Sequence, residues 1–458
     1  MENQVFDLII IGAGPGGYET AVEAAREGLN VAIVEREELG GTCLNVGCIP
    51  TKCLCHSAEV LDEARNGSRY GIQMSEVGFD LSAAVARKDE VVTKLVSGVG
   101  LLMKTPGITL LRGNAKLAGK GENETYCVEI ITNDEVLSIF AKNIIIATGS
   151  VTKFLPIEGA HSEGVVTSTE LLNMTSVPRR LCVIGGGVIG LEFASIFQSF
   201  GSEVTVVEFC KEVLPFFDRD MAKRLRTSMK KRGVTFKVGA AVTAIKDSAD
   251  GKVVEYDEKG KPGSTEADLV LMAVGRGANL ESLNLDEAGI AYTRRGISVD
   301  EHMRTNLAGV YAIGDINGLM QLAHAATFQG RVALQDILGK KEGKDIQLAI
   351  CPAAVFTVPE LAMVGKTEEQ LADEGVEYVA HKAFYRACGK ALAMDAEDGI
   401  VKVLTDKDDR ILGAHILGAH ASDLIHEVTL LMSLGGTLSD LKRTIHAHPT
   451  LSEILLAL

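Results

Sequence analysis

Two cysteines with four residues between them lie in a glycine-containing stretch, residues 40–52, and are well suited to chemistry. A bond between Cys43 and Cys48 would close a small disulfide ring. Pro50 suits the first turn of a helix, so Cys48 is expected near a helix N-terminus, where a thiolate is stabilised. The alternatives are a metal site or two packed thiols, but His56 stands alone and no second Cys or His pair at metal-ligand spacing lies nearby. The pattern predicts a redox-active cysteine pair and no metal site.

A second reactive group is expected in residues 446–453. His448 would act as general acid and base for thiols, because a thiol with a pKa of about 8.5 needs a base near pH 7. Glu453 would orient the imidazole of His448. A structural alternative is open: Thr450 and Glu453 have the spacing of a capping box, and Pro449 would simply begin a helix. His446 is the less favoured base.

Glycine-rich turns that could hold phosphates occur twice. Each turn follows an apolar strand, opens a helix, and precedes a second strand that ends in an acid, Glu35 or Glu208. Such glycines can also mark a tight turn alone, and such acids can be solvated strand ends. The glycines that would allow close approach of a pyrophosphate and close packing of the helix are Gly12, Gly14 and Gly17 in the first copy and Gly185, Gly187 and Gly190 in the second. Because a carboxylate at Glu208 would repel a 2′-phosphate, the second fold is expected to bind NAD rather than NADP.

Three further strands end in residues that a cofactor could contact. The strand at 143–147 leads into Thr148 and Gly149, and the strand at 268–274 leads into Gly275. The strand at 309–313 leads into Gly314 and Asp315, where the acid would face a ligand, although a turn aspartate would give the same pattern. All five residues are predicted to bind a cofactor.

Length, charge and cysteine usage limit the class of protein. With 458 residues the chain is expected to form two to four domains. Its net charge of −15 argues against nucleic acid or an anionic membrane as a partner. No apolar run approaches the roughly 18 residues of a membrane span and no secretory signal is visible, so a cytoplasmic protein is expected. The nine scattered cysteines favour reduced thiols, with any disulfide being catalytic.

Taken in order, the first glycine turn, the cysteine pair, the second glycine turn and the final His-Pro-Thr-x-x-Glu resemble the pyridine nucleotide-disulfide oxidoreductase family. The resemblance covers essentially all 458 residues. It implies an FAD-dependent, NAD-linked enzyme in which Cys48 is the thiol next to the flavin and Cys43 exchanges with the substrate. Lys52 matches the lysine beside flavin N5, and Glu192 matches the glutamate paired with it. Asp315 matches the aspartate that binds the FAD ribityl chain.

The resemblance also implies the architecture. In that family the C-terminal histidine acts on the disulfide of the neighbouring subunit, so a homodimer is expected. The expected fold class is α/β, with two Rossmann-like dinucleotide-binding domains, for FAD and NAD, and a C-terminal α+β dimerisation domain. The expected segments are 1–149 and 276–346 for the two parts of the FAD-binding domain, 150–275 for the NAD-binding domain and 347–458 for the interface domain.

Within the family, smaller points favour oxidation of protein-bound dihydrolipoyl groups. The partner would be a lipoyl domain or lipoyl carrier protein of a 2-oxoacid dehydrogenase or glycine cleavage system. These points are Leu451 and Ser452 inside the final motif, the expected NAD specificity, and Val188 with Gly190 where glutathione-type reductases have Tyr and Ala. The alternatives are a glutathione-type or mercuric reductase, or a non-catalytic flavin-binding subunit. Residues 276–279, which lack the usual proline, and 387–389 depart from the family pattern.

Overall fold

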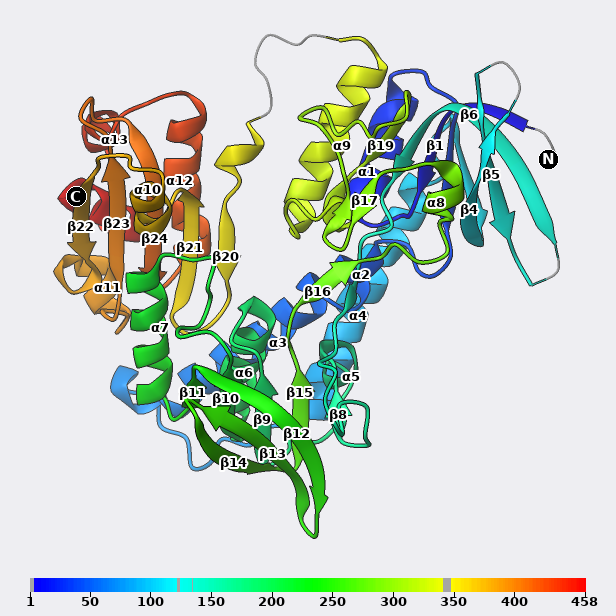
Figure 1. The fold of residues 1–458 in the computed structure, drawn as a ribbon. Coiled ribbons are helices and arrows are strands. Elements are labelled where there is room, and N and C mark those ends of the chain that lie inside the picture. The colour runs from blue at the N-terminus through cyan, green and yellow to red at the C-terminus, as the bar shows by residue number, and fades with distance from the viewer. Residues whose placement is uncertain (1–3, 122–123, 134, 341–346) are drawn as a thin grey trace. The chain divides into compact units, whose positions relative to one another are not determined.

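The computed structural model describes residues 4–121, 124–133, 135–340 and 347–458, which form two compact units (Figure 1). Unit 1 contains the described residues of Met1–Pro50, Ala86–Lys153 and Arg276–Leu348, and unit 2 those of Thr51–Val85, Phe154–Gly275 and Ala349–Leu458. Each unit is therefore assembled from three separate stretches of chain. The four expected domain segments stay a prediction, and the boundary after residue 346 falls outside the described residues.

A seven-stranded sheet forms the core of unit 1. Its strand order is β3-β2-β1-β6-β5-β4, with β19 also paired to β6. The pairs among β1, β2, β3, β6 and β19 are parallel, whereas β4 and β5 are antiparallel additions. Residues 8–11 of β1 are almost fully buried, as expected for a parallel strand with both faces covered. The strands are β1 (Gln4–Ile11), β2 (Val31–Glu35), β3 (Ile108–Arg112), β4 (Asn114–Lys120), β5 (Tyr126–Ile131), β6 (Val136–Ile146) and β19 (Val310–Ala312).

Helices and short strands complete unit 1. Helix α1 (Pro15–Arg26) packs against α9 (Ala323–Ile337), and the two lie side by side in Figure 1. Pro15 opens α1, where its missing N–H costs nothing and its fixed φ suits a helix. The remaining elements are α2 (Gly41–Asn45), β7 (Ser150–Thr152), β16 (Arg276–Ala278), α8 (Leu285–Ala288), β17 (Tyr292–Thr293), β18 (Gly296–Ile297) and the 3₁₀ turn η2 (Gly314–Asn317). Helices α3 (Cys48–Arg65) and α4 (Leu81–Leu102) each contribute residues to both units.

Unit 2 contains a second parallel sheet, in the order β11-β10-β9-β15-β8. Helix α6 (Val188–Phe200) follows β9 and is buried along most of its length, so it lies in the core of the unit. The other elements are β8 (Val165–Val166), α5 (Ser168–Leu171), β9 (Arg180–Ile184), β10 (Glu203–Glu208), α7 (Arg219–Lys231), β11 (Thr235–Val238) and β15 (Leu269–Met272). Both expected strand-turn-helix-strand units are therefore confirmed.

Two antiparallel sheets complete unit 2. The first joins β12 (Ala240–Ser248), β13 (Gly251–Glu258) and β14 (Lys261–Ala267). The second, in the order β20-β21-β24-β23-β22, forms a C-terminal α+β region with four helices and the 3₁₀ segment η5 (Leu451–Ala457). Its elements are β20 (Ala353–Val355), β21 (Glu360–Gly365), α10 (Glu368–Asp373), β22 (Val379–Phe384), α11 (Gly389–Ala393), β23 (Ile400–Thr405), β24 (Ile411–Gly418), α12 (Ala421–Ser433) and α13 (Leu438–Arg443). The expected α/β fold class is confirmed.

Candidate functional site

The cysteine pair lies where two helices meet. Cys43 is the middle residue of α2 and Cys48 is the first residue of α3, the helix-terminal position that the sequence predicted. The side-chain amide of Asn45 donates to the carbonyl oxygens of Leu39 and Gly41, each at 2.9 Å, and so fixes the loop between the two sulfurs. Cys43 is half-buried and Cys48 is exposed. This arrangement leaves Cys48 open to solvent at a helix N-terminus, while Cys43 beside it is partly covered.

Other cysteines are held as protonated thiols. Burial raises the pKa of Cys182 to about 12 and that of Cys351 to about 11. Burial and then the nearby charge of Glu192 raise the pKa of Cys55, whose sulfur lies 3.4 Å from the carbonyl oxygen of Phe356. A thiol that stays protonated is a poor nucleophile. These three cysteines therefore suit packing rather than exchange.

Lys52 and Glu192 form an ion pair inside unit 2. The Lys52 ammonium lies 3.0 Å from each carboxylate oxygen of Glu192, whose side chain is only 4% exposed. The backbone N–H of Phe356 donates to the same carboxylate at 3.0 Å, and the Lys52 ammonium lies 4.4 Å from the centre of the Phe356 ring. A buried carboxylate needs such partners. Lys52 is thereby fixed on α3, one turn after Cys48.

The two glycine turns are built alike. Gly12 has a φ of +103° and Gly185 a φ of +111°, a backbone conformation that other residues rarely adopt. A Cβ at Gly12 would lie 2.4 Å from the carbonyl oxygen of Ala147. A Cβ at Gly17 or Gly190 would lie about 2 Å from the carbonyl oxygen of the first glycine in its own turn. First and third glycines are therefore required by the turn and by helix packing.

The middle glycines face open space. Gly14 and Gly187 are the N-caps of α1 and α6, and no side-chain cap occupies either helix end. A Cβ at Gly187 would meet nothing within 4 Å, and one at Gly14 would meet only the Cα of Gly41 at 4.0 Å. An anion can approach the backbone N–H groups at such a helix end, where the helix dipole is positive. The two cradles fit the pyrophosphates of two dinucleotides.

The acids at the ends of the second strands, Glu35 and Glu208, occupy matching places. Both are buried, with 8% and 7% exposure. Glu35 accepts hydrogen bonds from the backbone N–H groups of Ala13 at 2.7 Å and Glu37 at 2.8 Å. Glu208 accepts them from Gly186 and, at 2.6 Å, from Cys210. Each carboxylate is thus held beside its glycine turn, where the ribose of a bound dinucleotide would lie.

Asp315 lies half-buried in a polar corner of unit 1. Burial raises the pKa of its carboxyl, while the Ser150 hydroxyl, which donates to it at 2.5 Å, and the charge of Arg276 lower it. The preceding residue, Gly314, donates its N–H to the side-chain oxygen of Gln329 at 2.7 Å. The corner therefore presents a carboxylate in a water-poor site, which fits a ligand that brings hydroxyl groups.

Thr148 and Gly149, the residues that join β6 to β7, are linked to Asn279. The Asn279 side-chain amide donates to the Thr148 carbonyl oxygen at 3.2 Å, and its backbone N–H donates to the Gly149 carbonyl oxygen at 3.0 Å. Gly149 and Gly275 both have positive φ, and a Cβ on either would meet nothing within 4 Å. Both positions are open to a ligand within their own unit.

His448 and Glu453 form a pair near the C-terminus. The Nδ1 atom of His448 lies 2.9 Å from one Glu453 oxygen, and the backbone N–H of Thr450 donates to the other at 2.8 Å. The Thr450 bond and then His448 lower the pKa of Glu453. The imidazole is 81% exposed. The capping alternative and the acid–base interpretation are thus compatible, because Glu453 uses one oxygen for each.

Several residues that hold these groups were not predicted, among them Phe356, Gln329 and Ser150. Phe356 and Gln329 lie in segments without a recognisable motif. Phe356 bonds Glu192, which is 164 residues away in the sequence, and Gln329 bonds the backbone N–H of Gly314. Ser150 directly follows Thr148 and Gly149, which was the one available signal.

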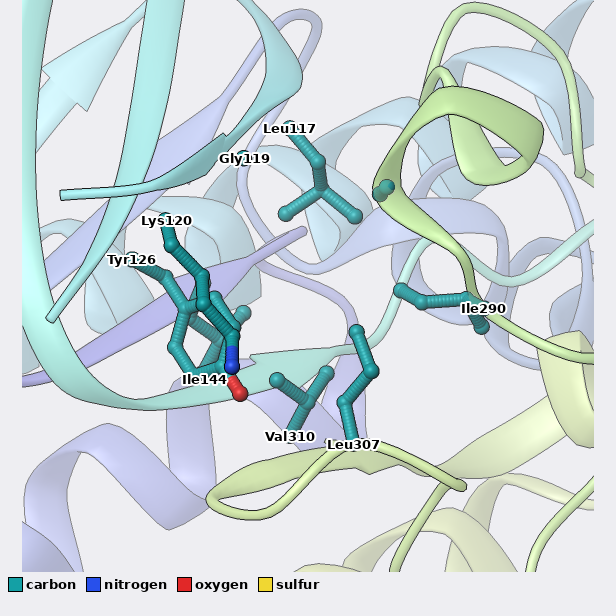
Figure 2. Close-up of a pocket in the computed structure, with 9 residues that line it drawn as sticks. Leu117, Gly119, Lys120, Tyr126, Ile144, Ile290, Leu307 and Val310 are labelled. Atoms are coloured by element: carbon teal, nitrogen blue, oxygen red, sulfur yellow. The ribbon is translucent and has the colours of Figure 1, made fainter. Parts of the chain in front are cut away.

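A small cavity lies elsewhere in unit 1. It has a volume of about 40 Å³, and Figure 2 shows side chains such as Leu117, Ile144, Leu307 and Val310 pointing into it. None of the predicted site residues lines this cavity, whose walls are mainly aliphatic, with Lys120 and Tyr126 among them. Among the residues that the structure describes, no cluster of His, Cys, Asp or Glu could bind a metal ion. Within the same ranges, every helix is too short or too polar to cross a membrane.

Comparison with known proteins gives the family. Residues 6–330 match the family model for pyridine nucleotide-disulphide oxidoreductases, and residues 351–457 match the dimerisation domain of the same family. A dihydrolipoyl dehydrogenase of Chlamydia muridarum (strain MoPn / Nigg) is 39% identical, over 99% of this chain and 96% of that protein. A mitochondrial dihydrolipoyl dehydrogenase of Pisum sativum is 40% identical, over 98% and 90%.

A solved structure gives the same result. The Cu(II) complex of the HOCl-induced flavoprotein disulfide reductase RclA from Escherichia coli has a TM-score of 0.86 and 32% identity, covering 100% of this chain and 98% of that chain. The full-length matches agree with the order of the glycine turns, the cysteine pair and the C-terminal region. The chain belongs to the pyridine nucleotide-disulphide oxidoreductase family.

Proposed function

We propose that this protein is an FAD-dependent dihydrolipoyl dehydrogenase that oxidises dihydrolipoyl groups and passes the electrons to NAD. The observation that supports it most is the pair formed by Cys43 in α2 and Cys48 at the N-terminus of α3, followed one turn later by the Lys52–Glu192 ion pair. The similarity over the full chain to dihydrolipoyl dehydrogenases supports the same substrate.

The first step is thiol–disulfide exchange. One substrate thiol gives its proton to Nε2 of His448, whose Nδ1 faces Glu453. The resulting thiolate attacks the sulfur of Cys43, the Cys43–Cys48 bond breaks, and Cys48 leaves as a thiolate. The second substrate thiol then attacks the mixed disulfide. It closes the lipoyl disulfide and releases Cys43, whose departing sulfur takes the proton of this second thiol. Two electrons and two protons thus leave the substrate, with one proton now on His448 and one on Cys43.

The residues that would hold the cofactors lie in both glycine-rich folds. FAD would lie against Gly12, Gly14, Gly17 and Glu35, with Thr148, Gly149, Gly314 and Asp315 as further contacts. NAD would lie against Gly185, Gly187, Gly190, Glu208 and Gly275. Bound FAD and NAD supply the redox chemistry that side chains lack, by accepting the electron pair and removing it as a hydride.

The role proposed for Lys52 is to keep a positive charge on α3 close to the thiolate of Cys48. Glu192 holds the ammonium at 3.0 Å through both oxygens, so the charge stays in one place. The Phe356 N–H fixes the carboxylate in turn. Neutralising Glu192 would therefore release Lys52 and change the redox behaviour of the pair.

A homodimer is supported by the dimerisation domain at residues 351–457. We propose that His448 of one subunit serves the cysteine pair of the other. The 81% exposure of His448 in the single chain agrees with this, because a second surface would be needed to exclude water around it. The proposed partner is a lipoyl domain or lipoyl carrier protein of a 2-oxoacid dehydrogenase or glycine cleavage system, in the cytoplasm.

The experiment compares two reactions on the purified protein, NAD-dependent oxidation of dihydrolipoamide and NADPH-dependent reduction of glutathione disulfide. We expect only the first. Cys48→Ser should lower its rate by roughly a thousand-fold or more, because both sulfurs are needed for exchange. Cys53→Ser, five residues further along the same helix, is the matched control and should leave the rate unchanged. A faster glutathione reaction, or an active Cys48→Ser variant, would reject the proposal.

A further inference from the structure

Arg276 has no role in the proposed reaction, yet it is tied into the site. It opens β16, which pairs antiparallel with β7 so that Arg276 faces Thr152. Its guanidinium lies beside Ser150, the first residue of β7. Nε donates to the Ser150 hydroxyl at 2.7 Å, and Nη2 donates to the Ser150 carbonyl oxygen at 2.6 Å. Two of its five N–H groups are therefore engaged by a single residue.

Ser150 connects this guanidinium to Asp315. The Ser150 hydroxyl accepts from Arg276 and donates to Asp315 at 2.5 Å. Burial lowers the pKa of the Arg276 guanidinium, while the charges of Asp315 and the Cys48 sulfur raise it. A half-buried cation thus balances a half-buried carboxylate through one hydroxyl, and the positive charge also acts on the cysteine loop.

The same guanidinium also touches the cysteine loop. Its Nη2 lies 3.5 Å from the hydroxyl of Thr42, the residue before Cys43. At the other end of the loop, a Cβ on Gly47 would lie only 2.8 Å from the carbonyl oxygen of Thr42, so Gly47 packs directly on Thr42. Gly47 precedes Cys48. Arg276 therefore contacts Thr42, which precedes Cys43 and against which Gly47, the residue before Cys48, packs.

We infer that Arg276 is a positioning residue for the disulfide chemistry, which holds the cysteine loop against the Ser150–Asp315 corner and stabilises the thiolate of Cys48 by its positive charge. The inference rests on the proposed function. Two other features favour the same thiolate, the N-terminus of α3 and Lys52 on its next turn. The Lys52 ammonium is paired with Glu192, and the Arg276 guanidinium is connected to Asp315 through the Ser150 hydroxyl.

The test measures the reactivity of Cys48 itself. The holoprotein is reduced with dithiothreitol, pulsed with iodoacetamide between pH 4 and 9, and mapped by peptide mass spectrometry. Arg276→Met should raise the midpoint of Cys48 alkylation by about one pH unit, so that alkylation at pH 6 slows about tenfold. Arg276→Lys should restore most of the difference. Arg294→Met, which removes the same charge from an exposed turn of unit 1, should match the wild type.

A wild-type midpoint in Arg276→Met would overturn the inference, and so would an Arg276→Lys variant that behaves like Arg276→Met. Arg276→Gln is a second variant that keeps a hydrogen-bond donor for Ser150 but removes the charge, in case Arg276→Met misfolds. It should shift the midpoint of Cys48 alkylation as Arg276→Met does. An unshifted midpoint in Arg276→Gln also overturns the inference. The oxidised wild-type protein provides the separate test of the proposed function. If its map contains no Cys43–Cys48 linked peptide, the proposed function fails whatever Arg276 does.

Discussion

The buried imidazole of His415 predicts how stability depends on pH. His415 lies in β24 with no exposed surface, and its Nε2 is 3.1 Å from the carbonyl oxygen of Lys366. Burial lowers its pKa to about 4, although the charge of Asp218 acts in the opposite direction. Lys402, which is bonded to Asp218 at 2.6 Å, also lowers it. The native protein therefore keeps this imidazole neutral in mild acid.

The sign and size of the effect follow from proton linkage. In the unfolded chain His415 has its ordinary pKa of about 6.5 and binds a proton that the folded protein rejects. The free energy of unfolding therefore falls as the pH decreases from about 6.5 to about 4. With about 1.4 kcal/mol for each unit of pKa, the loss is about 2 kcal/mol at pH 5 and about 3 kcal/mol when complete.

The assay is urea unfolding at pH 8, 6.5, 5.5 and 4.5, for the wild type and His415→Gln. Glutamine can still donate to the Lys366 carbonyl oxygen but does not titrate. The free energy of unfolding of the variant is subtracted from that of the wild type at each pH, so groups that titrate in both proteins cancel. This difference should fall by about 2 kcal/mol between pH 8 and pH 5, even if it changes sign. His302→Gln, at an exposed side chain, is the control and should run parallel to the wild type. Parallel curves for His415→Gln would refute the reasoning.

Three further predictions follow from the site and the core. Glu208→Ala should raise the KM for NAD about tenfold and weaken the preference over NADP, measured by steady-state kinetics; an unchanged preference would exclude Glu208 as the ribose contact. His448→Gln should lower kcat for dihydrolipoamide about 10²- to 10⁴-fold at unchanged flavin content, and near-normal turnover would remove it as the acid–base group. Lys402→Met leaves the buried Asp218 carboxylate without its cation, 2.6 Å away in the wild type, and should cost about 3–5 kcal/mol of stability in thermal unfolding; an unshifted transition would contradict this.

Local patterns made much of the fold predictable. Each glycine turn directly follows its strand and precedes its helix, so both nucleotide folds could be identified from short stretches of sequence. Pro50 located the start of α3 near Cys48 for the same local reason. The family assignment from these motifs is confirmed by the two family models. The individual site roles and the domain boundaries stay predictions.

Long-range contacts could not be predicted from one sequence. Phe356 and Glu192 are 164 residues apart, and Ser150 and Asp315 are 165 residues apart. No periodicity or motif marks a serine or a phenylalanine for such a contact, because the partner is chosen by tertiary packing. The same holds for Lys402, a charged residue in β23, whose buried ammonium is paired with Asp218, the N-cap of α7, 184 residues away in the sequence. For Glu453 the sequence offered two interpretations, a capping residue and a partner of His448, and could not choose between them. In the structure one carboxylate makes both contacts, through different oxygens.

The most direct test of the account follows the two sulfurs through one turnover. The oxidised protein is treated anaerobically with one equivalent of dihydrolipoamide in the absence of NAD, then alkylated and mapped. We predict that Cys43 and Cys48 change from a linked peptide to two alkylated thiols and that Cys53 and Cys55 keep their labelling. In a parallel sample, NAD added after the substrate and before the alkylation should restore the linked peptide. Identical labelling of Cys43 and Cys48 before and after the substrate would contradict the central claim.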